Sequence, residues 1–214
     1  MSEPGPFVAD VHAFWDGRHQ RAAELAAGGD RGLSEGENFE LYTVRLARLF
    51  EILRAHLAAE RPWELLDAGC GRGVFTDGLA RAGHDVLGVD FSETAISYAR
   101  AHHRGRYALS ALEDIDVPAK DAVVCIDVLF HVLDDAIWER ALARMTGAVR
   151  ARGLFVFADA MRAERFQLGD YIVHRSREEY EAALGRLGFR VLEIVPYAFG
   201  SNPNQLVACA RRVP

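Results

Sequence analysis

The sequence has few cysteines, and they are not spaced to act together. Cys70, Cys125 and Cys209 are far apart and form neither a CxxC pattern nor a Cys/His ligand set. This spacing argues against a disulfide framework and against a zinc site, so we expect three reduced thiols and no bound metal. No apolar run is long enough to cross a bilayer, and the first residues lack the basic-then-apolar order of a secretory signal. We therefore expect a cytoplasmic protein without a membrane partner.

Positive charge is scarce as well. The formal net charge is -6, which disfavours the broad electrostatic attraction that nucleic-acid binding requires and leaves a small molecule as the expected partner. Lys120 is the only lysine, and this bias toward arginine indicates a GC-rich bacterial genome. With 214 residues, half of them hydrophobic, the chain suits one globular domain with a substantial core. The sequence leaves the oligomeric state open.

The N-terminal segment is predicted to be helical. A glycine-rich stretch from Ala26 to Asn38 separates two helices, and Ser34 with Glu37 has the spacing of a capping box at the start of the second. That helix has one apolar face, made of Tyr42, Leu46, Leu49, Phe50, Leu53 and Leu57. We expect residues 1–60 to form a helical cap integral to the domain and residues 61–214 to form its core.

From Trp63 onward, short apolar runs alternate with helical patterns. The predicted strands are Glu64–Asp67, Asp85–Val89, Tyr107–Ser110, Ala122–Ile126, Leu154–Ala158, Val191–Val195 and Leu206–Ala210. The predicted helices are Val74–Ala82, Thr94–His103, Ala136–Val149 and Arg177–Leu187. This alternation predicts an α/β fold, a doubly wound and mostly parallel seven-stranded sheet covered on both faces. Only a turn-rich segment separates the last two strands, so the last one is expected to run antiparallel at or near the edge.

The stretch "DAGCGRGVFT", Asp67 to Thr76, directly follows the first predicted strand. Its alternate glycines permit unusual backbone angles and leave no side chain between the chain and a ligand. A second acid, Asp90, ends the next strand, where a carboxylate can accept two hydrogen bonds from a ribose diol. A dinucleotide site would share both features, but its third glycine is replaced by Val74, and Asp67 would repel a pyrophosphate. A nicotinamide-dependent oxidoreductase is therefore the weaker alternative.

The segment "LLDAGCGRGVFTDGLARAGHDVLGVDFSETAISYAR" resembles the cofactor-binding half of class I S-adenosylmethionine-dependent methyltransferases. The resemblance covers residues 63 to 135 closely, implies a Rossmann-like fold and S-adenosylmethionine as the cofactor, and agrees with an antiparallel last strand. It places Asp67 and the turn of Gly69, Cys70, Gly71 and Gly73 against the methionine part, Asp90 on the ribose, and Phe91 on the adenine. The family often has an aspartate near adenine where this chain has Ala111-Leu112-Glu113, so these three residues are expected to take that place. Asp127 is expected near the cofactor's amino-acid end.

By the same resemblance, Phe130 and His131 face the methyl group. Methyl transfer is an in-line displacement, and a hydroxyl acceptor must also lose its proton. A histidine suits that task, so His131 is the candidate base, with the alternative that it only shapes the pocket. From the N-terminal segment, Trp15 is expected to line the acceptor site, and Tyr42 or Arg45 to reach the cofactor carboxylate. His174 lies in the segment from Met161 to Arg175, which is expected to cover the cleft and select the acceptor.

The sequence thus predicts a bacterial methyltransferase of secondary metabolism that acts on a small molecule, at oxygen in preference to nitrogen. A different use of the same fold stays open: a cofactor-binding regulatory partner, or a sulfonium-assisted decarboxylation or cyclisation. The acceptor itself cannot be inferred, because the segments that would select it carry no recognisable motif.

Overall fold

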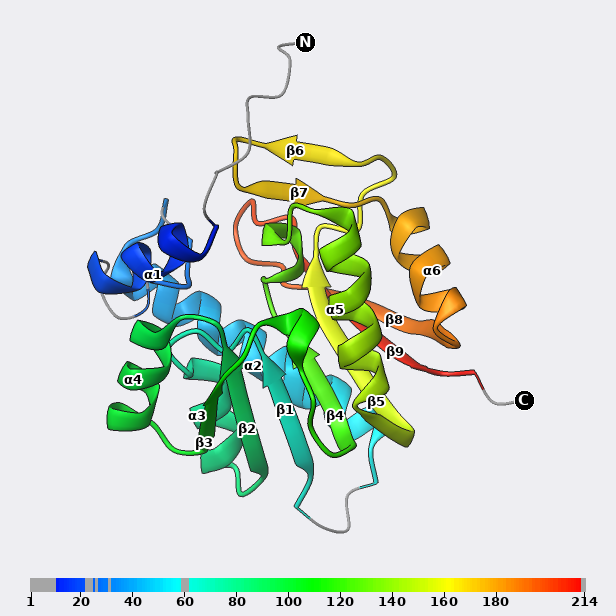
Figure 1. The fold of residues 1–214 in the computed structure, drawn as a ribbon, viewed down its shortest axis with the longest axis horizontal. Coiled ribbons are helices and arrows are strands. Elements are labelled where there is room, and N and C mark those ends of the chain that lie inside the picture. Colours follow the sequence, from blue (N-terminus) through cyan, green and yellow to red (C-terminus); the bar gives the residue numbers. More distant parts are fainter. Residues whose placement is uncertain (1–10, 22–24, 26, 31, 59–61, 213–214) are drawn as a thin grey trace.

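The structure is a computed structural model that describes residues 11–21, 25, 27–30, 32–58 and 62–212. Two N-terminal helices, α1 (Val11–Arg21) and α2 (Glu35–His56), precede an alternation of strands and helices (Figure 1). The alternation comprises β1 (Glu64–Ala68), α3 (Val74–Arg81), β2 (Asp85–Asp90), α4 (Glu93–His102), β3 (Arg106–Leu109), β4 (Lys120–Cys125), α5 (Asp135–Gly147), β5 (Val149–Asp159), α6 (Arg177–Arg186), β8 (Phe189–Pro196) and β9 (Gln205–Arg211). Two 3-10 turns, η1 (Leu112–Asp114) and η2 (Leu129–His131), follow β3 and β4.

The main sheet has seven strands in the order β3-β2-β1-β4-β5-β9-β8. Strands β1 to β5 are parallel, whereas β9 is antiparallel to both β5 and β8. The connection from β8 to β9 is too short for a crossover, so β9 reverses direction and inserts one position in from the edge strand β8. The predicted fold class, including the antiparallel last strand, is confirmed.

Helices cover both faces of the sheet (Figure 1). On one face, α5 and α6 pack Trp138, Leu142 and Tyr180 against β4 and β5, and on the other α2 and α3 bury a second cluster that includes Leu49 and Leu79. The predicted capping box of Ser34 and Glu37 is present at the start of α2. Because α2 supplies four leucine and isoleucine side chains to that second cluster, it is part of the domain core.

Two segments differ from the sequence-based expectation. The stretch after β5 forms a short hairpin of β6 (Phe166–Leu168) and β7 (Ile172–His174), although no strand was expected there. Strand β5 also begins at Val149, which was predicted to be the last residue of a helix, whereas the strand was expected to begin at Leu154. Val149 pairs with Lys120 and the next paired residue is Leu154, because the chain between them bulges through Arg152, whose φ is 63°. The good helix formers in this stretch conceal the bulge at the level of sequence.

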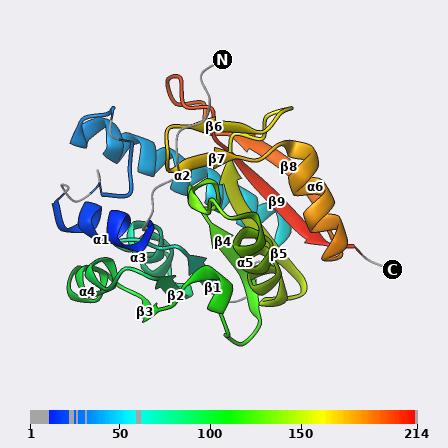
Figure 2. The same cartoon turned by 45° about the horizontal axis from the view of Figure 1, so that its top comes forward.

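Helix α1 and the β6–β7 hairpin lie at the same end of the sheet, where the parallel strands finish (Figures 1 and 2). Phe14 of α1 touches Tyr171 of the hairpin, with 5.3 Å between ring centroids. Ligands of open α/β sheets bind at this end, outside the carboxyl ends of the strands. None of the described helices is long and apolar enough to span a membrane.

Candidate functional site

A cavity of about 900 Å³ opens at the carboxyl end of the sheet. Its wall combines the glycine turn after β1, the ends of β2 and β4, the start of α5, and residues of α1 and α2. Most residues singled out from the sequence line it: Trp15, Tyr42, Arg45, Gly69, Cys70, Gly71, Asp90, Phe91, Ala111, Leu112, Glu113, Asp127 and His131. Asp67, Gly73, Phe130 and His174 lie behind the wall.

The glycine turn has the backbone that its sequence requires. Gly69, Gly71 and Gly73 have φ values of 76°, 50° and 90°, in the left-handed region that favours glycine. A Cβ on Gly69 would lie 2.6 Å from Val128, and one on Gly73 would lie 2.7 Å from the Tyr107 hydroxyl. Gly73 and Gly69 therefore allow close packing against Tyr107 of β3 and against Val128, and Gly69 and Gly71 also line the cavity.

Asp90 holds the turn in place. One of its carboxylate oxygens accepts the N–H of Gly71 and the other accepts the N–H of Ser92, both at 2.9 Å. These two bonds fix the orientation of the carboxylate at the end of β2, where it forms part of the cavity wall. Carboxylate oxygens accept more than one hydrogen bond each, so Asp90 can still receive hydroxyl donors from a ligand.

Asp67 points away from the cavity. Its side chain is 2% exposed and accepts a 2.6 Å hydrogen bond from the Thr76 hydroxyl of α3. Burial raises its pKa to about 6, although the bond from Thr76 opposes the shift. Asp67 thus joins β1 to α3 below the turn instead of reaching the ligand space. Burial also raises the pKa of the neighbouring Cys70 thiol well above its usual range, which makes it a filler and not a nucleophile.

Arg45 and Asp127 form a buried ion pair beside the turn. Arg45 Nη1 lies 3.0 Å from Asp127 Oδ2, and the two side chains are 4% and 11% exposed. The guanidinium lies against the rings of Tyr42 and Tyr197, at 4.8 and 5.3 Å from their centroids. Its Nε is buried and has no hydrogen-bond partner among the described residues. A buried guanidinium with one N–H donor still unpaired suits a carboxylate ligand.

The backbone of Asp127 is in the left-handed region, with a φ of 57°. Asp tolerates this conformation better than most residues, and three side chains hold it there. Besides the contact with Arg45, the Tyr197 hydroxyl donates to Asp127 Oδ1 at 3.0 Å and Asn204 Nδ2 donates to the same oxygen at 2.8 Å. The loop between β8 and β9 therefore supports Asp127 of the cavity wall by hydrogen bonds.

His131 lines the same cavity from η2. Its Nδ1 is 2.9 Å from the backbone oxygen of Tyr171. A carbonyl oxygen can only accept, so Nδ1 carries the proton and the lone pair of the neutral ring is on Nε2. Burial lowers the pKa of His131 to about 3, so the ring is neutral at physiological pH. Trp15 packs against the ring with 4.5 Å between centroids.

Phe130 and His174 support this region from behind. The Phe130 ring lies between His131 and His174, at 4.4 and 4.9 Å from their ring centroids. His174 Nδ1 contacts Asp159 at 2.5 Å, and the Tyr180 hydroxyl donates to the other oxygen of that buried carboxylate at 2.6 Å. The pairing with Asp159 draws His174 into the core, away from the acceptor space in which the sequence placed it.

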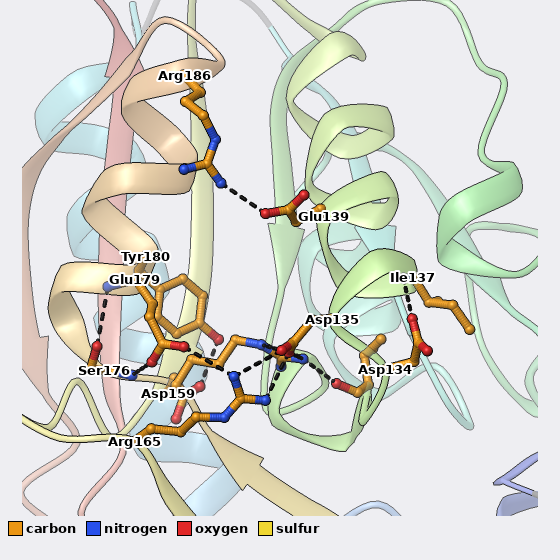
Figure 3. A network of polar contacts seen from close by, with 12 residues as sticks. Asp134, Asp135, Ile137, Glu139, Asp159, Arg165, Ser176, Glu179, Tyr180 and Arg186 are labelled. Carbon is orange, nitrogen blue, oxygen red and sulfur yellow. Dashed lines mark hydrogen bonds and ion pairs between the residues drawn. The ribbon is translucent and has the colours of Figure 1, made fainter.

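The β6–β7 hairpin is fastened to the start of α5 by one carboxylate. Arg165, just before β6, donates to both oxygens of Asp135 at 2.8 and 2.9 Å and also reaches Glu179 of α6 (Figure 3). Arg175, just after β7, donates to Asp135 Oδ1 at 2.6 Å. Both ends of the hairpin are therefore fixed beside the cavity, and Arg165 and Asp135 form part of its wall.

Sequence reasoning missed the hairpin, the Asp135 anchor, and the contributions of Tyr197 and Asn204. For the hairpin a signal existed, since in "FQLGDYIVH" two short runs with apolar residues flank a Gly-Asp turn. For Asp135 the local pattern, two adjacent acids before a predicted helix, indicates only a helix N-terminus, where negative charge is favourable. For Tyr197 and Asn204 no local signal exists, because their partner Asp127 is far away in the sequence.

Comparison with known proteins decides the family. A family model described as a methyltransferase domain matches residues 65–153. A ubiquinone biosynthesis O-methyltransferase of Albidiferax ferrireducens is 30% identical, over 97% of this chain and 82% of the relative. The chain belongs to the class I S-adenosylmethionine-dependent methyltransferases. The chain spans only about half the length of other ubiquinone biosynthesis O-methyltransferases that it matches. The relative from Alkalilimnicola ehrlichii is 33% identical over 58% of this chain and 52% of its own length. The relative from Methylococcus capsulatus is 34% identical over 68% of this chain and 56% of its own length.

Solved methyltransferase structures have the same fold. Magnesium protoporphyrin IX methyltransferase from Synechocystis PCC 6803 with bound S-adenosylmethionine superposes with a TM-score of 0.71 at 17% identity, over 94% of this chain and 95% of that one. A TehB-like S-adenosylmethionine-dependent methyltransferase from Corynebacterium glutamicum has a TM-score of 0.64 at 25% identity, over 94% and 99% of the chains. Of the two cofactor classes that the glycine turn left open, membership of this methyltransferase family selects S-adenosylmethionine over a dinucleotide.

Proposed function

We propose that this methyltransferase transfers a methyl group from S-adenosylmethionine to a hydroxyl of a small-molecule acceptor in the cytoplasm. The observation that carries the proposal is one cavity with two different walls. A glycine turn with Asp90 forms one wall, and His131, with Nδ1 held as a donor, forms the other. When bound, the cofactor supplies an electrophilic methyl group on a positively charged sulfur.

The residues on the cofactor side fit its three parts. Asp90 is oriented to accept hydrogen bonds from the ribose diol, and the wall at Phe91 and Ala111 to Glu113 is available to the adenine. For the amino-acid end, the Arg45–Asp127 pair offers a cation for the carboxylate and an anion for the ammonium group. Asp67 acts indirectly in this proposal, because its hydrogen bond to Thr76 holds the turn and not the ligand.

His131 is proposed to receive the acceptor's proton on Nε2. A pKa of about 3 makes it a weak base that cannot remove a phenolic proton in advance. The acceptor oxygen becomes positively charged as it is alkylated, however, and its proton is then strongly acidic. A weak base suffices at that stage, so the low pKa of His131 indicates proton transfer late in the displacement. The hydrogen bond from Nδ1 to Tyr171 then stabilises the imidazolium.

In the acceptor space, the cavity wall beside His131 is mostly apolar and aromatic, apart from Asp134 and the Asp135–Arg165 ion pair. Trp15, Val132, Leu133 and Ile137 line it beside His131, and α1 and the β6–β7 hairpin cover it. Such a wall suits a planar phenolic ring and keeps water from the reacting atoms. The names of the relatives, which are O-methyltransferases, support oxygen as the acceptor atom. Phe130 and His174 are proposed to shape this space through His131 without touching the acceptor.

The test is an activity screen with the purified protein. It is incubated with S-adenosylmethionine and matched phenols, catechols and amines, and both S-adenosylhomocysteine and the methylated product are measured. We expect methyl ethers from phenolic acceptors, with release of one S-adenosylhomocysteine per ether. Methylation of amines alone would contradict oxygen specificity. Consumption of S-adenosylmethionine without S-adenosylhomocysteine would favour decarboxylation or cyclisation, and binding without turnover of any acceptor would favour a regulatory role.

A further inference from the structure

His19 of α1 has unused hydrogen-bonding capacity at the cofactor side of the cavity. Its side chain is 4% exposed and forms part of the cavity wall. The Nδ1 atom is buried without a hydrogen-bond partner among the described residues. Leaving a buried polar atom unpaired costs about 1 to 3 kcal/mol, and native structures rarely keep such an atom without a reason.

The position of the His19 ring is set by contacts outside the ring. Arg72 of the glycine turn donates to the His19 backbone oxygen and lies over the Tyr98 ring, 4.5 Å from its centroid. Asp16, one turn earlier in α1, accepts a 2.7 Å bond from the Ser92 hydroxyl at the start of α4. Helix α1 lies beside α4 in both views of the fold (Figures 1 and 2). These two bonds hold α1 against the turn.

The edge of the ring that carries Cε1 and Nε2 faces the bare side of Gly71. A Cβ built on Gly71 would lie 3.5 Å from His19 Cε1 and 4.0 Å from Nε2. The N–H of Gly71 is the group that Asp90 holds, so the imidazole lies over the turn next to the ribose-binding carboxylate. Burial and the nearby Arg72 and Arg18 lower the pKa of His19 to about 4, which keeps the ring neutral at physiological pH.

We propose that His19 binds the cofactor by a hydrogen bond between its Nε2, the ring nitrogen that faces Gly71, and a ribose hydroxyl, so that the ribose is held by Asp90 from the sheet and by His19 from α1. A hydroxyl both donates and accepts, and it therefore pairs with a neutral imidazole in either tautomer. This inference rests on the proposed function, since it assumes the same nucleoside in the same place. It makes α1 a binding element for the cofactor and not only a cover for the acceptor.

The test compares two ligands with three proteins by calorimetry at pH 7.5. The ligands are S-adenosylhomocysteine and its 2′,3′-dideoxy analogue, and the proteins are the wild type, His19→Phe and the control His56→Phe. His56 is exposed at the end of α2, where it pairs with Glu193. We expect His19→Phe to weaken S-adenosylhomocysteine binding about tenfold, equivalent to about 1.4 kcal/mol, and to leave the analogue's affinity unchanged. The control variant should bind both ligands as the wild type does.

Two outcomes would overturn the assignment of His19. An equal loss for both ligands would mean that the ring only packs α1 onto the core, and no loss for either would mean that it does not contact the ligand. A second variant, His19→Gln, keeps a hydrogen-bonding amide and should retain most of the affinity, which provides the measurement if His19→Phe folds poorly. Absence of S-adenosylhomocysteine binding by the wild type would instead contradict the proposed function itself.

Discussion

Replacing Arg45 by methionine tests the buried ion pair of the site. The substitution keeps a long apolar side chain between Tyr42 and Tyr197 but leaves the Asp127 carboxylate without its cation. Both partners are almost fully buried, and removing one member of a buried pair costs about 3 to 5 kcal/mol because the other charge stays behind. For a chain of this size that loss lowers the unfolding midpoint by roughly 10 °C.

Arg48→Met is the matched control on the same helix. Arg48 pairs with Glu51 three residues later, and the two side chains are 41% and 62% exposed. Exposed pairs of this kind contribute about 0 to 1 kcal/mol, so the control should unfold close to the wild type. Urea unfolding followed by circular dichroism measures both variants. If Arg45→Met lost less than about 1 kcal/mol, the pair would not hold Asp127 in place as the structure indicates.

The same variant also tests which end of the cofactor Arg45 contacts. A charge-assisted hydrogen bond is worth about 1.5 to 3 kcal/mol, so Arg45→Met should weaken S-adenosylhomocysteine binding roughly 10- to 100-fold. Methylthioadenosine has the nucleoside but no amino-acid part, and its affinity should stay the same. An equal loss for the two ligands would place Arg45 away from the carboxylate and assign it to the general shape of the cavity.

Two further predictions follow from the turn and from the candidate base. Gly73→Ala should destabilise the fold by about 3 kcal/mol, because the added Cβ would meet Tyr107. The control Gly83→Ala, at a similar φ of 94° and with no described atom within 4 Å of the added Cβ, should cost about 1 kcal/mol. Equal losses of the two variants in urea unfolding would show that Tyr107 moves aside. His131→Ala should lower kcat about 100-fold without changing S-adenosylhomocysteine affinity. Because the folded-state pKa of His131 is about 3, the wild-type pH–rate profile should lack a His131 limb near pH 6.5, and a limb there that the variant removes would contradict the depressed value.

The lowered pKa of His131 also makes the stability of the fold depend on pH. In the unfolded chain this histidine gains a proton near its ordinary pKa of about 6.5, whereas the folded protein resists protonation until about pH 3. The unfolded state therefore binds more protons between these values, and stability falls as the pH drops through that window. His19, with a pKa of about 4, acts in the same direction.

Local patterns in the sequence were enough for the fold and for half of the site. Strands and helices follow from apolar periodicity, and the glycine turn follows from the need for positive φ at Gly69, Gly71 and Gly73. Asp90 could be placed because the carboxyl ends of adjacent parallel strands meet at one edge of the sheet. Each of these inferences depends on residues close together in the chain, where spacing alone sets the geometry.

Only the tertiary structure decided which side chains line the cavity. It turned Asp67 toward Thr76 and His174 toward Asp159, and it brought His19 over the glycine turn. It also joined Asp127 to Asn204, 77 residues further along the chain, by a hydrogen bond. Contacts across such separations depend on how whole elements pack, because a buried polar group takes whichever partner the packing brings within hydrogen-bond distance. The residue types were visible in the sequence, but their partners were not.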